Sequence, residues 1–324
     1  MTQAPNIDSV MVQWGDRLFY PGNRIVKVAP PPKLSAGSTH QRAMAIRKRI
    51  EATVVHRAPQ VMVKVTGGGR GMKAIAAHFR YISKNGGLDI EDEHGQKLRD
   101  KDALPELADD WRYGGSLIED QSQRREAFNI MLSMPRGTDP SIVQRAAREF
   151  AQVELADHKY VMVLHDHQAN PHVHISVRAE SKHGKRLNPR KADLQRWRET
   201  FAEKLRGWGI DAEATRQATR GASRNYDPLW RVKAKEDGRL RSGPASAKVG
   251  VMARLTRAAA LEAWRHIAEA LAASGQTGNR VLAAAICIYL AEQPRRQLPE
   301  ASRQGSAQIE PYRGVTRLGL DRAR

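Results

Sequence analysis

Two short apolar runs, separated by a histidine-rich turn, constrain the fold more than any other part of this sequence. The runs cover residues 160–164 and 172–177, and their length and composition are typical of β-strands. Asn170 and Pro171 lie between them and favour a turn. The sequence therefore predicts two adjacent strands with a sheet built around them.

Histidines are concentrated on these two predicted strands. Alternate side chains of a strand point to opposite faces, so His172, His174 and Ser176 share one face. The turn can bring His165, at the end of the preceding strand, beside them. Three neutral imidazoles on adjacent strands suit a divalent transition metal with open coordination positions. Four of the eleven histidines lie within residues 165–174, which favours a metal site over polar residues on an exposed strand.

The composition favours a polyanionic partner. Fifty-four Lys and Arg against 35 Asp and Glu give a formal charge of +19, and nucleic acid is the first interpretation of such an excess. A basic surface that merely keeps the protein soluble is the alternative. We find no apolar segment long enough to span a bilayer and no secretory signal, so no membrane insertion is expected. The single cysteine, Cys287, fits a reducing cytoplasm.

The middle of the chain predicts an α+β domain over residues 59–220, in which helices flank a sheet. Further strands are expected at 61–65 and 129–135, and helices at 72–83, at 139–155 and from 188–189 to 207–209. The segment 88–121 is acidic and predicts mainly loops. A glycine turn at 67–69 leads into a helix, where it could cradle a phosphate or act as an ordinary connector.

The two ends of the chain predict separate pieces. Residues 1–58 form an N-terminal extension, with a proline-rich break at 30–32 and a basic helix at 41–54. The basic helix is equally consistent with a solvated surface and with an arm that contacts phosphates. A basic linker (221–250), a small helical hairpin (251–295) and a polar basic tail (296–324) follow. The hairpin could dock a partner or pack against the main domain.

Tyr81 lies outside the apolar stripe of the helix predicted at 72–83. That stripe consists of Met72, Ile75, Ala76, Phe79 and Ile82. The tyrosine hydroxyl is therefore free to point away from the core. An ordinary amphipathic surface tyrosine is the alternative.

Three segments, in this order, resemble a known family: residues 79–83, 131–138 and 165–174. They are similar to the relaxases of mobilisable plasmids and integrative elements, including the T-DNA border endonucleases. These proteins belong to the His-hydrophobic-His endonuclease superfamily. Residues 187–191 also resemble close members, and the resemblance covers about half the chain. It implies the superfamily's antiparallel fold for 59–220, with a small C-terminal helical region added.

The resemblance also implies a chemistry. Tyr81 would attack one phosphodiester of single-stranded transfer-origin DNA and form a 5′-phosphotyrosyl link, leaving a free 3′-hydroxyl. His165, His172 and His174 would hold Mg²⁺ or Mn²⁺ against a phosphate oxygen, and Ser133 would contact DNA. The implied partners are accessory relaxosome proteins and the coupling protein of a type IV secretion channel.

The sequence departs from the family pattern beside the first histidine. The family often has aspartate two positions after it, where this chain has His167, with Asp166 one place earlier. Three roles stay open: Asp166 orients a histidine, His167 is the base, or both are bystanders. His165 itself could serve as the base instead of a ligand. Arg80, which precedes Tyr81, could bind the phosphate or lower the tyrosine pKa.

Basic residues that follow the histidine strand are candidates for a single-stranded DNA channel, with a solvated basic loop as the alternative. They are Arg178, Lys182, Lys185, Arg186, Arg190 and Lys191. Arg80 and Lys84, on either side of Tyr81, are further candidates for DNA contact.

Other functions remain open at this stage. A rolling-circle replication initiator shares the metal site and tyrosine chemistry, but its tyrosine usually follows the histidine pair, whereas Tyr81 precedes it by about 90 residues. A non-catalytic DNA-binding protein would use the histidines structurally or for zinc. Tyr113, in a glycine-flanked segment, is a substitute nucleophile.

Overall fold

The computed structural model describes residues 6–20, 36–216, 219–220, 234, 237–239 and 251–292. Its centre is a six-stranded sheet with the order β1-β4-β6-β5-β2-β3, in which neighbouring strands pair antiparallel wherever a register is defined. The strands are β1 (Met62–Gly67), β2 (Ile90–Asp92), β3 (Lys97–Leu98), β4 (Ala127–Ser133), β5 (His158–His165) and β6 (His172–Ser181). The predicted α+β class with an antiparallel sheet is confirmed.

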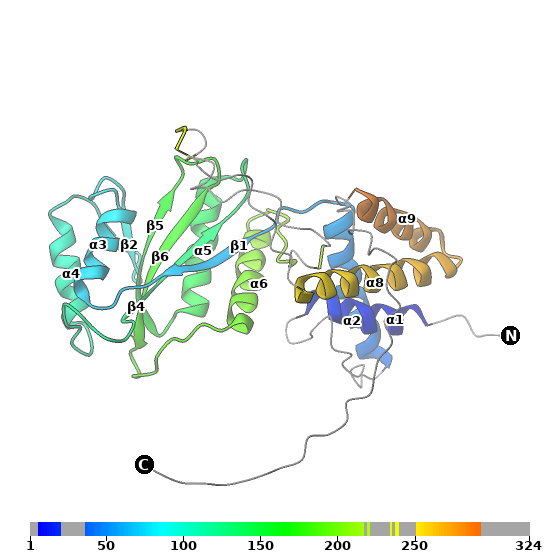
Figure 1. Cartoon of the computed structure of the whole chain (residues 1–324), viewed down its shortest axis with the longest axis horizontal. Coiled ribbons are helices and arrows are strands. Elements are labelled where there is room, and N and C mark those ends of the chain that lie inside the picture. Colours follow the sequence, from blue (N-terminus) through cyan, green and yellow to red (C-terminus); the bar gives the residue numbers. More distant parts are fainter. Residues whose placement is uncertain are drawn as a thin grey trace, which may run out of the picture. The chain divides into compact units, whose positions relative to one another are not determined.

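Helices lie on both faces of the sheet, and further helices come from the two ends of the chain (Figure 1). They are α1 (Ile7–Phe19), α2 (Ala36–Val54), α3 (Met72–Ile82), α4 (Ala103–Tyr113), α5 (Pro140–Glu154), α6 (Lys191–Gly207), α8 (Val251–Ala273) and α9 (Thr277–Ala291). Helix α5 begins where the sequence predicts, because the Asp139 side chain accepts a hydrogen bond from the Ser141 N–H. Helix α6 begins at Lys191 rather than at 188–189.

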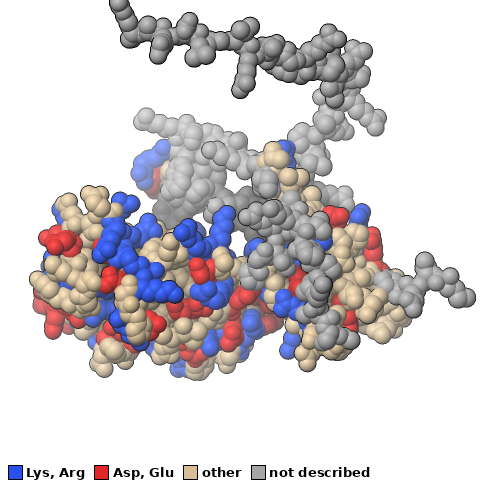
Figure 2. All heavy atoms as spheres, turned by 90° about the horizontal axis from the view of Figure 1, so that it is seen from below, with Lys and Arg blue, Asp and Glu red and all other residues tan. Residues whose placement is uncertain are grey.

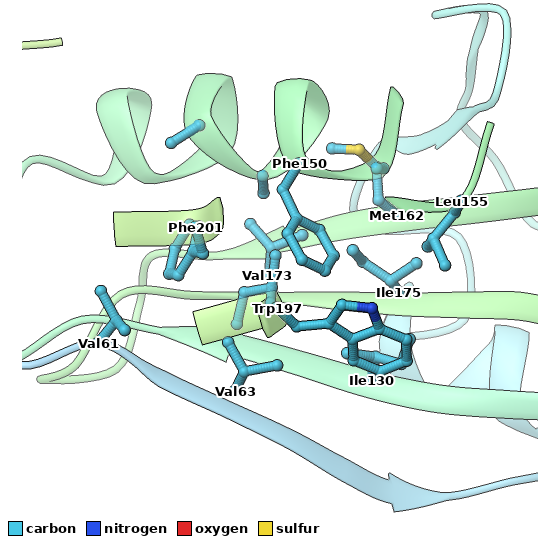
Figure 3. Packing of buried hydrophobic residues seen from close by; sticks show 14 of the residues in the cluster. Val61, Val63, Ile130, Phe150, Leu155, Met162, Val173, Ile175, Trp197 and Phe201 are labelled. Carbon is cyan, nitrogen blue, oxygen red and sulfur yellow. The ribbon is translucent and has the colours of Figure 1, made fainter. Parts of the chain in front are cut away.

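One face of the sheet packs against α5 and α6. Val173, Ile175 and Val177 alternate along β6 and are fully buried. Phe150 of α5 and Trp197 of α6 pack over them, as does Phe201 (Figure 3). The burial of these apolar residues fixes which face of β6 points inward, and the histidines of β6 must then occupy the opposite face.

The opposite face is covered in part by α3 and α4. The predicted stripe of α3 is buried against Val161 and Val163 of β5, and Phe79 meets Trp111 of α4 edge to face at a centroid distance of 4.9 Å. This packing anchors α3 to the β5 side of the sheet. The face of β1 and β4 beside it stays more open, with Met62, Lys64 and Thr66 exposed.

Two segments form more regular structure than the sequence indicates. Residues 88–121, expected to be mainly loops, contain β2, β3 and α4. Leu104, Leu107 and Trp111 form an apolar stripe at helical spacing, which the acidic composition hides. The mixed segment near the N-terminus forms α1, because the Asn6 side chain caps its first turn.

The N- and C-terminal helices share one hydrophobic core. Ile46 and Ile50 of α2 pack in the same cluster as Trp264 and Ile267 of α8, together with residues of α1 and α9. Residues 30–32 and 296–324 lie outside the described part of the chain, as does nearly all of 221–250. The two ends, which sequence patterns treat as separate pieces, are thus one packed unit.

The arginines of α2 form internal contacts. Arg42 pairs with Asp16 of α1 at 2.9 Å, and Arg47 donates to Asn279 of α9 at 2.6 Å. Arg49 pairs with Glu199 of α6 and Glu213 at 3.3 Å each. These arginines join α2 to neighbouring elements, which favours neither of the two roles that the sequence left open for the basic helix.

We expect Gly15→Ala to destabilise this helical unit. A Cβ atom at Gly15 of α1 would lie 2.3 Å from Cγ2 of Ile46, which is fully buried and has no room to move. Overpacking of this kind costs about 1–3 kcal/mol. Gly278→Ala is the matched control, since a Cβ there meets nothing within 4 Å and alanine favours a helix. Urea unfolding of both variants tests this; an unchanged midpoint for Gly15→Ala would contradict it.

Candidate active site

The strand register brings the three predicted metal ligands together. His165 of β5 lies directly opposite His172 of β6, and His174 lies two residues further on the same face. All three side chains are buried, with relative exposures of 5%, 6% and 9%. One ring nitrogen from each lies within 4.8 Å of the others, which is compatible with coordination of one ion.

Main-chain carbonyls orient two of the three rings. His165 Nε2 donates to the Ile82 carbonyl at 2.7 Å, and His172 Nδ1 donates to the Asn170 carbonyl at 2.9 Å. Because each of these nitrogens carries the proton, Nδ1 of His165 and Nε2 of His172 keep a free lone pair. His165 Nδ1 is buried without a hydrogen-bond partner among the described residues. A bound cation would satisfy it.

The environment keeps His165 and His174 uncharged at neutral pH. Burial lowers the pKa of His165, and it lowers the pKa of His174 to about 3, with the neighbouring imidazoles adding to the effect. Only a neutral imidazole can coordinate a metal. The donor set, the free lone pair and the neutral state therefore fit a divalent cation.

Tyr81 lies beside this cluster at the end of α3. Its side chain is 70% exposed, and its ring centroid lies 6.4 Å from that of His174. The next residue, Ile82, supplies the carbonyl that holds His165, so the end of α3 is tied directly to the histidines. Arg80 and Lys84 are exposed on either side, and the charge of Lys84 contributes to lowering the pKa of His165.

Asp166 and His167 lie in the exposed turn between β5 and β6. The ring of His167 is 5.1 Å from that of His165, measured between centroids. The carbonyls of Ile82 and Asn170, rather than the Asp166 carboxylate, orient His165 and His172. The base role of His167 and the orienting role of Asp166 stay predictions, as does the alternative that both are bystanders.

Two predicted DNA contacts are buried. Ser133 is 4% exposed, and its hydroxyl lies 3.4 Å from the Pro171 carbonyl, to which it donates. Arg178 is 3% exposed and donates to the carbonyls of Trp111 and Ser116. Ser133 therefore ties β4 to the turn before β6, and Arg178 fixes the end of α4. Neither arrangement fits the predicted contact with DNA.

Lys182 and Arg186 of the predicted channel lie at the far end of β6, away from the histidines. This strand has ten residues and spans roughly 30 Å at about 3.3 Å per residue, so it carries the chain away from the histidines. Lys182 there pairs with Asp157 at 2.9 Å, and Arg186 pairs with Glu126 and Glu180. Lys185, Arg190 and Lys191 are exposed and follow Lys182 along the chain. Proximity in sequence to the metal strand was a misleading guide.

The contacts also decide the role of the glycine turn at 67–69 and the position of Tyr113. The N–H groups of Met72 and Lys73, after the glycine turn, donate to the carbonyls of Glu119 and Asp120, so this turn acts as a connector. Tyr113 ends α4 near Arg178, which is four residues from His174, or roughly 13 Å along β6. The structure thus places Tyr81, and not Tyr113, beside the histidines.

Sequence reasoning missed two residues near the site. Lys64 of β1 is paired with Met131, which is paired with His174, so all three side chains share the histidine face. His78 lies one helical turn before Tyr81, with its ring 6.4 Å from that of His174. Two sequence patterns could have pointed to them: the alternation of side chains along β1 for Lys64, and the i, i+3 spacing from Tyr81 for His78.

In the view of Figure 2, Lys and Arg side chains gather over the side of the molecule that carries the sheet in Figure 1.

Comparison with known proteins shows what the segment that carries the histidines is similar to. Residues 87–210 match the model of the relaxase family described as MobA/VirD2-like, nuclease domain. This segment, which is less than half of the chain, is similar to a relaxase nuclease domain. A curated relative, the T-DNA border endonuclease VirD2 of Rhizobium radiobacter, is 27% identical over 183 residues. That alignment covers 50% of this chain and 43% of VirD2, so the chain matches less than half of its relative's length.

The family match covers only part of the region around the site. It includes the three clustered histidines and the β4 and β6 strands, but it begins six residues after Tyr81. The assignment of the nucleophile therefore depends on the geometry described above. Among the described helices, none is both long enough and apolar enough to cross a membrane.

We expect the histidine cluster to bind a divalent metal ion such as Mn²⁺. Replacing His165, His172 or His174 with alanine removes one of three ligands and should weaken binding at least about 10-fold. His183→Ala is the control, because His183 is exposed and lies with Lys182 beside Asp157, away from the cluster. Titration followed by the electron paramagnetic resonance signal of free Mn²⁺ measures this. Equal affinities in all four variants would rule out the site.

Proposed function

We propose that this relaxase domain nicks single-stranded DNA by metal-assisted transesterification, with Tyr81 as the nucleophile. The observation that carries this proposal is the position of Tyr81, an exposed tyrosine whose ring lies 6.4 Å from that of His174 in a buried three-histidine cluster. An exposed nucleophile beside a prospective Lewis acid is the arrangement that phosphoryl transfer requires.

The main obstacle to this reaction is the tyrosine proton. A tyrosine has a reference pKa of about 10, so ionising it at pH 7 costs roughly 4 kcal/mol. Mg²⁺ or Mn²⁺ held by His165, His172 and His174 would polarise the scissile phosphate and offset charge on its oxygens. The proton needs an acceptor nearby, and His167 is the candidate, because both ring nitrogens of His165 are taken up once it binds the metal and donates to Ile82.

The bonds exchanged keep the strand ready for rejoining. The Tyr81 hydroxyl oxygen forms a bond to phosphorus, and the bond between phosphorus and the 3′-oxygen breaks. The tyrosine proton moves to the base, and a proton is returned to the leaving 3′-oxygen. Because one phosphate ester replaces another, the 3′-hydroxyl can later attack the 5′-phosphotyrosyl link.

The DNA path proposed here differs from the channel expected from sequence. Arg80 and Lys84 flank Tyr81, and Lys64 lies on the open β1–β4 part of the histidine face. These three cations surround the histidine end of the sheet, whereas Lys182 and Arg186 lie at the other end. We therefore assign the phosphate contacts near the nick to the first group.

The biological setting is part of the same proposal. The relative VirD2 is a T-DNA border endonuclease, which supports a site- and strand-specific nick at the transfer origin of a mobile element. Conjugative transfer or mobilisation would then involve accessory relaxosome proteins and a type IV secretion coupling protein as partners.

We expect Tyr81→Phe to abolish covalent capture of DNA without abolishing binding. Wild-type protein incubated with Mn²⁺ and labelled single-stranded oligonucleotides from its transfer origin should form a protease-sensitive adduct on a denaturing gel. Phenylalanine removes only the hydroxyl, so the adduct should disappear while affinity stays within about threefold. Tyr113→Phe is the matched control and should retain the adduct.

The outcomes separate the competing functions. An adduct that persists in Tyr81→Phe but not in Tyr113→Phe would move the nucleophile to Tyr113. Binding without any metal-dependent adduct in the wild type would favour a non-catalytic DNA-binding protein.

We expect DNA affinity to fall steeply with salt, and to depend on cations at the histidine end of the sheet. Lys64→Ala and Lys84→Ala should each weaken binding and reduce the slope of log affinity against log salt by about 0.7. Lys182→Ala removes the same charge at the far end and should have little effect. Fluorescence anisotropy at several salt concentrations measures these slopes. Equal losses in all three variants would show that only net charge matters.

A further inference from the structure

A β-bulge interrupts β1 beside the open part of the histidine face. The register between β1 and β4 shifts between Val65 and Gly67, and Gly67 then pairs with Asn129 of β4. Bulges are common at sheet edges and next to active sites, where they change the direction of side chains. β1 is an edge strand of the sheet. The bulge therefore leaves one position on the exposed edge of this face without a side chain.

The amide of Asn129 lies beside that position. Asn129 pairs with Ser176, which is two residues after His174 in β6, so the amide is on the histidine face and roughly 7 Å from His174 along the strands. The nearest atom that a Cβ at Gly67 would meet is Asn129 Nδ2, at 3.8 Å. Glycine within a strand often marks a place where a ligand approaches closely. Asn129 is partly exposed, so a ligand can reach its amide.

The hydrogen bonds of Asn129 set what this amide can recognise. The Ser176 hydroxyl donates to Asn129 Oδ1 at 3.4 Å, which orients the amide. Asn129 Nδ2 donates to no group in the described part of the chain. An amide nitrogen carries two N–H donors. The side chain therefore offers donors to the open side of the sheet, while its acceptor atom is engaged within the protein.

We propose that Asn129 recognises a guanine base close to the nick. An amide that offers only donors suits a base edge made only of acceptors, and among the purines this is the N7–O6 edge of guanine, since adenine has an amino group beside N7. Lys64 lies in the same row of the sheet as His174 and is exposed, so it would hold an adjoining phosphate. The inference rests on the proposed function, because it requires single-stranded DNA to cross the histidine face.

The test measures base preference at each position around the nick by fluorescence anisotropy without metal. The wild type should prefer guanine to adenine at least about fivefold at one position. Inosine retains N7 and O6 and should bind as guanine does, whereas 7-deazaguanine lacks N7 and should bind more weakly. Asn129→Ala should lose this preference at that position and leave the preferences at the other positions unchanged.

Two further variants separate recognition from a general loss of structure. Asn129→Asp keeps the shape of the side chain but replaces the donor with an acceptor, so the preference should move to cytosine, whose N4 amino group a carboxylate accepts. Gly67→Leu keeps Asn129 and covers its amide. The backbone at Gly67 is not left-handed, so leucine adopts it without strain, and the guanine preference should again be lost.

The outcomes are distinct. Loss of the preference at one position in both Asn129→Ala and Gly67→Leu, with a change to cytosine in Asn129→Asp, supports the proposal. A wild type without a guanine preference near the nick, a preference that survives in Asn129→Ala, or an equal loss of affinity for every sequence would overturn it. A wild type that prefers guanine but forms no adduct with Mn²⁺ would instead overturn the proposed function.

Discussion

The antiparallel register between β5 and β6 is the constraint on which the candidate site depends. His165 faces His172 only because Leu164 faces Val173 and Met162 faces Ile175. A slip of one residue would turn the histidines toward the core packed by α5 and α6, and would expose Val173 and Ile175. The hydrophobic face, with its large burial free energy, therefore enforces the geometry of the polar face. The positions of the histidines on one face of the sheet therefore depend on the apolar packing on the other face.

The sequence predicts this part well because both signals are local. The alternation in 172–177 and the stripe that leaves Tyr81 outside the core are periodic patterns, and the structure confirms the strand, the helix and the meeting of His165 with His172 and His174. The sequence could not indicate how far from the histidines a residue lies along a strand or helix. Lys182 and Arg186 are near the histidines in sequence but lie a full strand length away, whereas Lys64 is distant in sequence and shares their face. The proximity of His78 to His174 likewise depends on how α3 lies against β6, which no local pattern encodes.

The structure shows that several of the many basic residues make internal contacts. Much of the excess charge is not directed at a ligand: Arg42 and Arg49 connect helices, and Arg178 holds the carbonyls of Trp111 and Ser116. Guanidinium groups suit this use, because they can satisfy several acceptors at once and remain charged when partly buried. Net charge therefore indicates the class of partner, but it overstates the number of cations available to that partner.

The hydrogen bond from His165 to the Ile82 carbonyl joins the end of α3 to the histidine cluster through a single peptide unit. Tyr81 is the adjacent residue, so a force applied to its side chain passes through one residue to a ring of the cluster. If DNA is tethered there, tension along the strand and occupancy of the cluster are thermodynamically linked, and each must change the free energy of the other by the same amount. The end of α3 and the histidine cluster would then respond to each other through this one hydrogen bond.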